Sequence, residues 1–461
     1  MTPEEFRANG HLLVDWIARY LDEVGNYPVL SQVQPGDIRA KLPTSPPSSP
    51  EPFTAVLDDI DGVIMPGITH WQSPNFFAYF PANRSPVSIL GELLSAGLGV
   101  QGMSWATSPS ATELETHVLD WMVELLDLPA VFVGNGVIQD SASSATLCAI
   151  LAARDRARAA GASIETLVGY ASSQAHSSIE KGLRIGGIPA DRFRKVDIDD
   201  AFAMRPEALA AAIAADRADG LVPFFVCAAA GATSTLAFDP VAEIAAITKA
   251  ATEAGGIWLH VDAAMSGIAA LCPEFRWVNN GVEHADSYCT NAHKWMGVNF
   301  DCTLFYVADR GPLLDALSIL PPFLRTAQTG SVIDYRDWQV PLGRRFRALK
   351  LWFVLRCDGV EAIAAMVRDH IAWTEELSAA MAGDDRFEIV APVALSLLVF
   401  RLRGGDEATA ALIGAVKASG RADLTQTIAG GKLAVRVSIG SRLTERRHVQ
   451  ALWELLQEFA G

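Results

Sequence analysis

One lysine lies in a sequence setting that favours covalent chemistry. Lys294 is the fourth residue of Asn-Ala-His-Lys-Trp-Met-Gly at 291–297, which follows the segment 286–290. That segment predicts a short buried strand, and we expect Lys294 in a loop beyond the strand's carboxyl end, where open α/β sheets place their ligands. A lysine beside His, Trp and apolar residues is a candidate for a lowered pKa and for Schiff-base formation. The alternative is a solvated loop lysine.

A carboxylate upstream complements this lysine. Residues 257–261, Ile-Trp-Leu-His-Val, predict a central parallel strand with Asp262 at its carboxyl tip. A buried aspartate is unfavourable unless it meets a cation. The protonated pyridine nitrogen of pyridoxal 5'-phosphate is such a cation, and Lys294 would hold the aldehyde of the same cofactor as an imine. The alternative for Asp262 is the N-cap of a following helix.

Length and composition limit the class of protein. The chain has 461 residues, 50% of them hydrophobic, which suits two or three packed units. A formal net charge of −16 argues against a nucleic-acid partner. The six cysteines lack C-x-x-C spacing, so neither a metal site nor a disulfide framework is expected. Without a signal-peptide pattern or a membrane-spanning run, we expect a cytoplasmic protein with no membrane partner.

The first residues predict a helical arm. Apolar residues recur at helical spacing from 2 to 24, and Thr-Pro-Glu-Glu at 2–5 is a plausible helix start. The Pro/Ser-rich segment 42–52 would let this arm reach away from the body. We expect the arm to pack on a partner subunit, and the alternative is an arm folded onto its own domain.

Two further stretches have the composition of ligand-binding segments. Five aromatic residues lie between positions 71 and 81, which indicates either core packing or the apolar wall of a ligand site. Small hydroxyl residues at 141–146 open an alanine-rich helix that runs to Arg158. Free N–H groups at such a helix start bind phosphate, although an ordinary serine cap explains the pattern equally well.

The middle of the chain alternates strand and helix patterns. Residues 166–170 predict a strand followed by His176 at the mouth of a helix, and 221–230 predict a buried strand ending at Gly231. This alternation predicts a doubly wound, mainly parallel sheet. A histidine such as His176 either makes a structural hydrogen bond or stacks on a flat ligand ring.

Together these motifs resemble a known family, the pyridoxal-phosphate group II decarboxylases, and in particular the aromatic L-amino acid decarboxylases. The resemblance runs almost from end to end, through 1–7, 71–81, 141–143, 174–178, 260–264, 291–295 and 341–347. It implies an α/β fold of fold-type I, the aspartate aminotransferase-like class, in a homodimer with its active sites at the subunit interface. It also implies an N-terminal arm at 1–85, a large PLP-binding domain at 86–365 and a small α/β domain at 366–461.

The resemblance assigns roles to individual residues. Lys294 would bind the cofactor aldehyde, Asp262 would pair with the pyridine nitrogen, and His176 would stack on the ring. The remaining cofactor contacts that it implies are Ala142, Ser143, Thr233, Ala264, Asn291 and His293. The substrate contacts that it implies are Trp71, Tyr79, Phe80, Pro81, Ala82, Gly343 and Arg436, with Gln101 and Met103 reaching in from the other subunit.

The implied reaction is decarboxylation of an aromatic L-amino acid to its amine. The small residues Gly343 and Ala82 predict a pocket that accepts indole as well as phenyl rings, so tryptophan, phenylalanine, tyrosine and DOPA are the expected substrates. An aminotransferase would share Lys294 and Asp262, but it usually stacks an aromatic residue where His176 lies. A non-catalytic protein of this fold is disfavoured because both Lys294 and Asp262 are present.

One position departs from the family pattern. In the loop motif 320–325, Phe323 stands where most of these decarboxylases have the tyrosine that protonates the substrate Cα. Without that proton the resemblance shifts toward the aldehyde synthases of the family, which form aldehyde, ammonia, CO₂ and peroxide. His176 and Lys294 are alternative proton donors. We expect the amine as the product, because the other motifs match decarboxylases.

Overall fold

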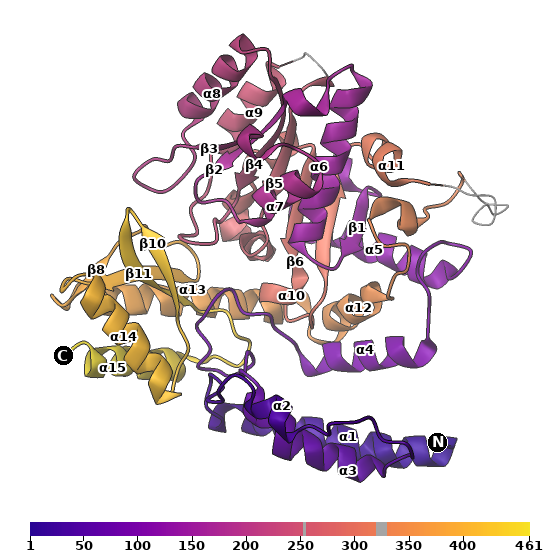
Figure 1. The fold of residues 1–461 in the computed structure, drawn as a ribbon, viewed down its shortest axis with the longest axis vertical. Coiled ribbons are helices and arrows are strands. Elements are labelled where there is room, and N and C mark those ends of the chain that lie inside the picture. Colours follow the sequence, from indigo (N-terminus) through magenta and orange to yellow (C-terminus); the bar gives the residue numbers. More distant parts are fainter. Residues whose placement is uncertain (252–254, 320–329) are drawn as a thin grey trace.

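A central sheet organises the chain. The computed structural model describes residues 1–251, 255–319 and 330–461, and the described residues form a seven-stranded sheet in the order β1-β7-β6-β5-β4-β2-β3 (Figure 1). Strands β3, β2, β4, β5 and β6 are parallel, and β7 runs antiparallel to β6 and β1, which confirms the mainly parallel sheet. The strands are β1 (Gly136–Gln139), β2 (Leu167–Ser172), β3 (Phe193–Val196), β4 (Val222–Ala229), β5 (Trp258–Asp262), β6 (Ser287–Asn291) and β7 (Thr303–Val307).

Helices cover both faces of this sheet because its strands are apolar on both faces. Val137, Cys289 and Phe305 belong to a core with one set of helices, and the neighbouring Ile138 and Tyr288 belong to the core on the opposite face. The first set contains α6 (Ala142–Ala159), α7 (Ser178–Ile185) and α11 (Gly311–Leu317). The second contains α5 (Pro109–Leu125), α8 (Pro206–Ala218) and α9 (Val241–Lys249).

A second, smaller unit lies beside the main sheet. Its four-stranded antiparallel sheet has the order β10-β11-β9-β8, with strands β8 (Phe387–Ile389), β9 (Leu397–Leu402), β10 (Thr425–Ala429) and β11 (Lys432–Ser438). The helices of this part of the chain are α12 (Arg347–Cys357), α13 (Val360–Ala382), α14 (Asp406–Ser419) and α15 (Arg446–Phe459). Because Ile363 of α13 packs in the large core and Met381 in the small one, the change of core falls inside one helix. The predicted boundary between the large and the small domain, at residues 365 and 366, stays a prediction.

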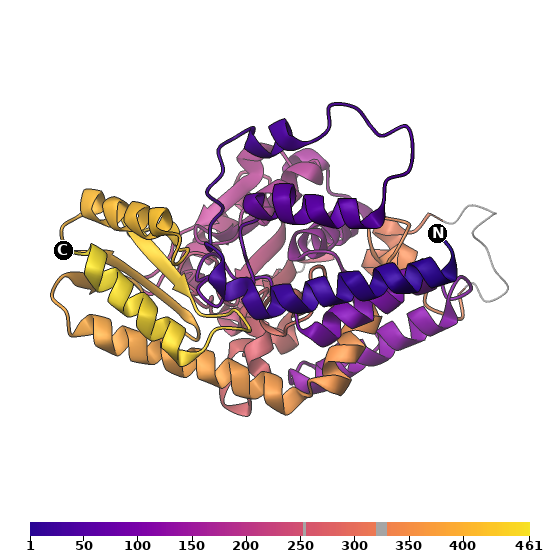
Figure 2. The same cartoon turned by 90° about the horizontal axis from the view of Figure 1, so that it is seen from below.

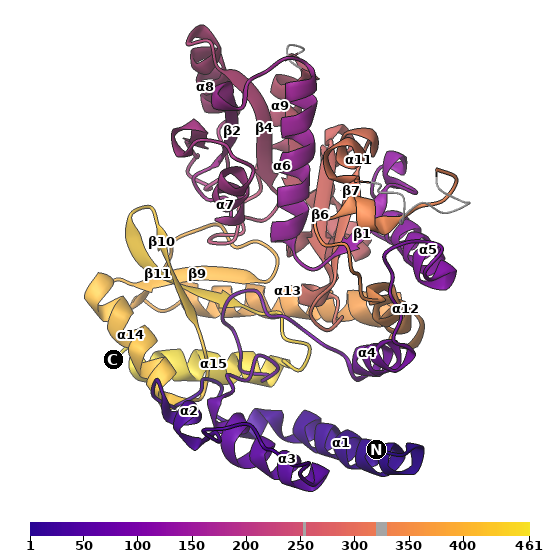
Figure 3. The same cartoon turned by 45° about the vertical axis from the view of Figure 1, so that its right-hand side comes forward.

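The N-terminal helices form an arm beside the body (Figures 2 and 3). Helix α1 (Pro3–Glu23) begins at the predicted position, where Thr2 and Glu5 form a capping box, and it has no buried residue. It contacts its own chain through Trp16 Nε1, which donates to Asp61 Oδ1 at 2.8 Å. The remaining helices of the first hundred residues are α2 (Asp37–Lys41), α3 (Phe53–Asp59) and α4 (Pro86–Leu98). None of the helices in the described residues has the length and apolarity of a membrane span.

One prediction about local structure is wrong. Lys294 does not lie in a loop but in α10 (Ala292–Trp295), a four-residue helix that follows β6 directly. A helix of one turn is unstable alone and must be held by its surroundings. Trp295 contributes to this, because it is fully buried and its Nε1 donates to Nδ1 of His370 on α13 at 3.0 Å.

The buried histidines make the stability of the fold dependent on pH. Burial lowers the pKa of His370 to about 3, of His293 to about 3 and of His260 to about 4. These side chains are neutral in the folded state, whereas the unfolded chain takes up protons near pH 6.5. Their contribution to stability is therefore complete above about pH 6.5 and is lost as the pH falls toward the folded-state values.

His370→Gln should reduce this pH dependence. The glutamine carbonyl still accepts from Trp295 Nε1, but one titrating group is removed, so the loss of unfolding free energy between pH 7 and 5.5 should shrink by about 1.2 kcal/mol. Urea denaturation at both pH values measures it, with His11→Gln on the exposed side of α1 as the control. An unchanged loss in the His370 variant would contradict the prediction.

Candidate active site

The carboxyl ends of the central strands surround one small cavity. It has a volume of about 120 Å³ and lies where β4, β5 and β6 end and α6 begins. The predicted residues Phe80, Ala142, Ser143, His176, Thr233, Asp262, Ala264, Asn291 and Lys294 line it, and so do Ser141, Ala229, Gly231, Ala232 and Met265. The fold therefore brings the lysine, the aspartate, the histidine and the helix start to one site.

Lys294 points a desolvated amine into this cavity. Burial lowers the pKa of Lys294, and the neighbouring Asp262 carboxylate opposes that shift. Its Nζ lies 5.4 Å from the centre of the Phe80 ring and forms no hydrogen bond or ion pair with any described residue. A lowered pKa increases the fraction of unprotonated amine, which is the nucleophilic form.

Asp262 ends β5 with a partly open carboxylate. Its Oδ1 accepts from the Ala264 backbone N–H at 3.1 Å and from Cys289 Sγ at 3.7 Å, whereas Oδ2 has no partner among the described residues. The next helical segment is capped at Met265, so Asp262 is not its N-cap. Asp262 and Lys294 line the same cavity without forming an ion pair, which leaves the carboxylate available to a cation between them.

His176 stands at the exposed rim of the cavity, just before α7. The Ser178 backbone N–H donates to its Nδ1 at 3.2 Å, and Ser178 Oγ lies 2.8 Å from the same atom. Nδ1 is therefore an acceptor, and the proton of the neutral ring lies on Nε2. Desolvation lowers the pKa of His176, which favours the neutral ring at pH 7. Of the two roles predicted for His176, the structural hydrogen bond is present. This hydrogen bond lies in the plane of the ring and does not occupy the face that would stack on a ligand.

The start of α6 provides a place for an anion. Ser141 caps this 18-residue helix, and its Oγ accepts from the Ser144 N–H at 3.2 Å. The N–H groups of Ala142 and Ser143 have no partner among the described residues, and the helix dipole favours negative charge there. Asn291 lines the same cavity, and its Oδ1 accepts from Thr303 Oγ1 at 2.8 Å, whereas its amide nitrogen has no acceptor among the described residues.

The Phe80 ring lies close to two basic side chains. Arg436 Cζ on β11 lies 5.0 Å from the ring centre, and Lys294 Nζ lies 5.4 Å from it. Burial lowers the pKa of Arg436 to about 10, and its Nη2 has no partner among the described residues. Arg436 does not line the cavity itself, but it is held next to it by Ser234 O at 3.1 Å and Thr425 Oγ1 at 3.0 Å.

The other aromatic residues of the 71–81 segment divide between core and surface. Phe76 and Phe77 are buried in cores, whereas Trp71 and Tyr79 stack on each other at 5.2 Å and are 37% and 53% exposed. Tyr79 also has a φ of +54°, an unfavourable conformation for a residue with a side chain. Core packing is therefore confirmed for Phe76 and Phe77, and the ligand wall stays a prediction for the rest of the segment, of which Phe80 lines the cavity.

Several predicted residues do not line the cavity of their own chain. His293 instead accepts the Cys302 backbone N–H at Nδ1, at 3.0 Å. Gln101 contacts the Gly343 region, where its Oε1 accepts from the Arg344 N–H at 2.6 Å. The remaining predicted residues outside the cavity are Trp71, Tyr79, Pro81, Ala82, Met103, Gly343 and Arg436. Phe323 lies outside the described residues.

Five lining residues were not assigned to the site individually, although Ser141 belongs to the helix start at 141–146 that was expected to bind phosphate. Gly231 and Ala232 follow the predicted strand 221–230 directly, and Gly231 has a φ of +99° at the turn into the cavity. Ser141 precedes two residues that were predicted. For Gly231, Ala232 and Ser141, the position at a strand end or a helix cap could have indicated a place at the site. Nothing in the sequence distinguishes Ala229 or Met265 from core residues.

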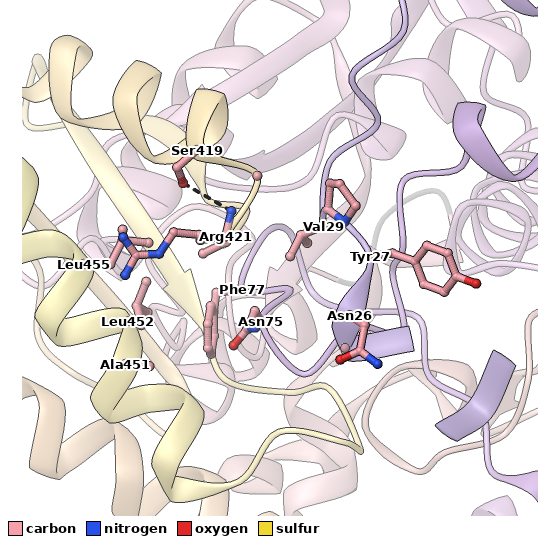
Figure 4. A pocket seen from close by; sticks show the side chains of 14 residues that line it. Asn26, Tyr27, Val29, Asn75, Phe77, Ser419, Arg421, Ala451, Leu452 and Leu455 are labelled. Atoms are coloured by element: carbon pink, nitrogen blue, oxygen red, sulfur yellow. Dashed lines mark hydrogen bonds between the residues drawn. The ribbon is translucent and has the colours of Figure 1, made fainter. Parts of the chain in front are cut away.

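A larger cavity elsewhere lacks comparable chemistry. It has a volume of about 360 Å³ and lies between residues 25–29 and the C-terminal helices α14 and α15 (Figure 4). Among the described residues that line it, the charged side chain is Arg421, which is paired with Glu458 at 2.8 Å. None of the predicted site residues in the described part of the chain lines it.

The smaller cavity has the groups that a pyridoxal-phosphate enzyme requires: a desolvated lysine amine, a carboxylate with a free oxygen and a helix start for the phosphate. Residues 35–403 match the family described as the pyridoxal-dependent decarboxylase conserved domain. The chain belongs to this family, within its aromatic amino acid decarboxylases, and it is a PLP-dependent carboxy-lyase of fold-type I.

Individual relatives match over essentially their whole length. Tryptophan decarboxylase 2 of Oryza sativa subsp. japonica is 46% identical, over 100% of this chain and 95% of the relative. Phenylacetaldehyde synthase of Arabidopsis thaliana is 47% identical, over 100% and 97%. The crystal structure of Oryza sativa TDC with PLP and tryptamine superposes with a TM-score of 0.96 at 37% identity, over 100% of this chain and 98% of that one.

Borohydride reduction of the PLP-loaded protein should leave the pyridoxyl group on Lys294, and peptide mapping by mass spectrometry locates it. Lys350 is the internal comparison, because it is a buried lysine whose Nζ is paired with Glu92 at 2.9 Å, whereas Lys294 is partly buried and has no such partner among the described residues. Lys294→Ala should abolish the modified peptide, and Lys350→Met should not. A pyridoxyl group on Lys350 or any other lysine would contradict the assignment.

Proposed function

We propose that the protein decarboxylates aromatic L-amino acids such as tryptophan, phenylalanine, tyrosine and DOPA, releasing CO₂ and the arylalkylamine. The observation that carries the proposal is the cavity in which Lys294 and Asp262 face the same space beside the Phe80 ring. The relatives named as tryptophan decarboxylase and aromatic-L-amino-acid decarboxylase support the same reaction class.

In this proposal each residue has a defined task. When bound, PLP accepts the electron pair that remains on Cα as CO₂ leaves. Lys294 binds the cofactor aldehyde through Nζ, and Asp262 keeps the pyridine nitrogen protonated. Ala142, Ser143 and Asn291 donate hydrogen bonds to the phosphate, and the neutral His176 ring stacks on the cofactor. Thr233, Ala264 and His293 complete the cofactor surroundings.

The substrate side of the proposal rests on aromatic and small residues. Phe80 lines the cavity as an apolar wall. We assign Trp71, Tyr79, Pro81 and Ala82, which lie outside the cavity of their own chain, to the substrate contacts beside it. Arg436 stays protonated near neutral pH because its lowered pKa is still about 10, so its free Nη2 suits a substrate carboxylate. Gly343 leaves space beside Gln101, since a Cβ there would lie 3.3 Å from Gln101 Nε2.

A second candidate function is oxidative decarboxylation to an aldehyde. Phe323 at the position of the family's proton-donating tyrosine favours it, and so does the similarity to a phenylacetaldehyde synthase. That reaction consumes O₂ and water and releases aldehyde, ammonia, CO₂ and H₂O₂, so it depends on air. We place amine formation first.

Product analysis in air and under argon tests both functions. Wild type should release CO₂ and amine from tryptophan and phenylalanine equally in both atmospheres. Phe323→Tyr should raise any ratio of amine to aldehyde, because a positioned proton donor contributes about 10²–10⁴-fold. Phe275→Tyr is the control, because Phe275 is partly buried and does not line the cavity.

Two outcomes would decide against parts of the proposal. Aldehyde and peroxide as the wild-type products in air would make the second function correct. Faster turnover of histidine or glutamate than of aromatic amino acids, or exchange of the amino group with a keto acid, would exclude the first. If wild type forms amine alone and Phe323→Tyr changes nothing, Phe323 is not at the reacting centre and His176 is the next donor to test.

We also propose a homodimer, with the domain limits 1–85, 86–365 and 366–461 and a cytoplasmic location. Two observations support the dimer: α1 has no buried residue although Phe6 and Val14 are apolar, and α4 exposes Leu90, Leu94 and Leu98 in a row along one side. In the proposed dimer these faces are covered, and Gln101 and Met103 enter the partner's cavity.

Subunit mixing tests whether the sites are shared. Lys294→Ala and Met103→Arg should each be inactive alone. If Met103 acts in the partner's site, random mixing after joint refolding should restore roughly a quarter of wild-type activity, because each mixed dimer has one intact site. An active monomer, or no recovery in a proven mixed dimer, would contradict the shared site.

A further inference from the structure

The segment 82–85 is bonded to the helix that carries Lys294. The Asn83 backbone N–H donates to His293 O at 2.8 Å, and the Ser85 N–H donates to Gly297 O at 2.7 Å. Helix α10 has only four residues, so the carbonyl groups at its end lack partners within the helix. A distant segment of the chain therefore supplies the hydrogen bonds that a longer helix would make itself.

The Asn83 side chain occupies the centre of this contact. Its Nδ2 donates to Lys294 O at 2.6 Å and to Gly440 O at 2.5 Å, and its Oδ1 accepts from the Arg442 N–H at 2.7 Å. The side chain is buried, with 2% of the residue exposed. These partners fix the orientation of the amide, because two carbonyl groups need donors and one N–H needs an acceptor.

Asn83 therefore connects three parts of the site. It follows the aromatic wall at Phe80, it holds the backbone of Lys294, and it joins both to Gly440 and Arg442 beyond β11. The titratable residues among its partners, His293, Lys294 and Arg442, contact it through main-chain atoms. The Arg442 guanidinium instead pairs with Asp358 at 3.3 Å.

We propose that Asn83 is a positioning residue for Lys294: its amide fixes the Lys294 backbone and thereby the place from which the lysine amine meets the cofactor aldehyde. The inference rests on the proposed function only in taking Lys294 as the cofactor lysine. Asparagine suits this task because an isosteric carboxylate offers no donor to the two carbonyl groups.

The test compares PLP affinity in variants that lose these bonds. Asn83→Ala should weaken PLP binding roughly 10- to 100-fold, because two buried carbonyl groups lose their donor. Absorbance titration of the apoprotein with PLP measures the dissociation constant, and borohydride mapping measures the fraction of Lys294 that is modified. Asn279→Ala is the matched control, because Asn279 is buried and its Nδ2 donates to Leu126 O at 3.0 Å, away from the cavity.

Asn83→Asp gives a readout that general destabilisation does not produce. The introduced carboxyl can donate one hydrogen bond while it is protonated and none when it is ionised. If PLP binding needs a donor to the Lys294 carbonyl, the PLP-bound state favours the protonated carboxyl and raises its pKa. Binding relative to wild type should therefore weaken as the pH rises through that pKa, whereas the Asn83→Ala ratio should stay constant.

The outcomes separate this inference from the proposed function. The inference is supported if both Asn83 variants bind PLP more weakly than wild type. Asn279→Ala should lose a similar amount of thermal stability and keep the PLP affinity of wild type. Wild-type affinity in Asn83→Ala, or equal weakening in Asn83→Ala and Asn279→Ala, overturns it. If wild type itself carries the pyridoxyl group on another lysine, the proposed function has failed instead.

Discussion

The site depends on holding two opposite charges in one cavity without letting them pair. Lys294 and Asp262 are both partly desolvated, and neither forms an ion pair with any described residue. Such groups are unfavourable in a folded protein unless a ligand or solvent compensates them. A cofactor with an aldehyde for the amine and a basic ring nitrogen for the carboxylate compensates both. In the proposed function, these two unpaired groups are the physical basis for cofactor binding.

The fold meets this constraint with rigid elements. Asp262 ends β5, which lies between β4 and β6 in the sheet, and Lys294 follows β6 by three residues. Because β5 and β6 are parallel neighbours, their carboxyl ends lie side by side. Helix α6 starts at the same edge and adds its free N–H groups. The helices on both faces exclude water from the strands, so the charges are placed by the core and not by mobile loops.

The sequence predicts much of this arrangement because strands and helix starts have local signals. The apolar run before Asp262, the serine cap before α6 and the capping box of α1 all depend on neighbouring residues. Helix α10 was missed because four residues are too few to show a helical period. Asn83 was missed because its partners lie 211 and 357 residues away in the chain. The aromatic pattern of 71–81 does not by itself distinguish Phe80 at the cavity from Phe76 and Phe77 in the cores, and only the family resemblance singled out Phe80.

A crystal structure of the protein with PLP would test the central claim most directly, namely that the separation of Lys294 and Asp262 is a place for the cofactor. We expect the cofactor aldehyde carbon bonded to Lys294 Nζ, the ring nitrogen within hydrogen-bond distance of Asp262 Oδ2, and the phosphate on the N–H groups of Ala142 and Ser143. A cofactor bonded to another lysine, or a ring whose nitrogen faces away from Asp262, would contradict the account.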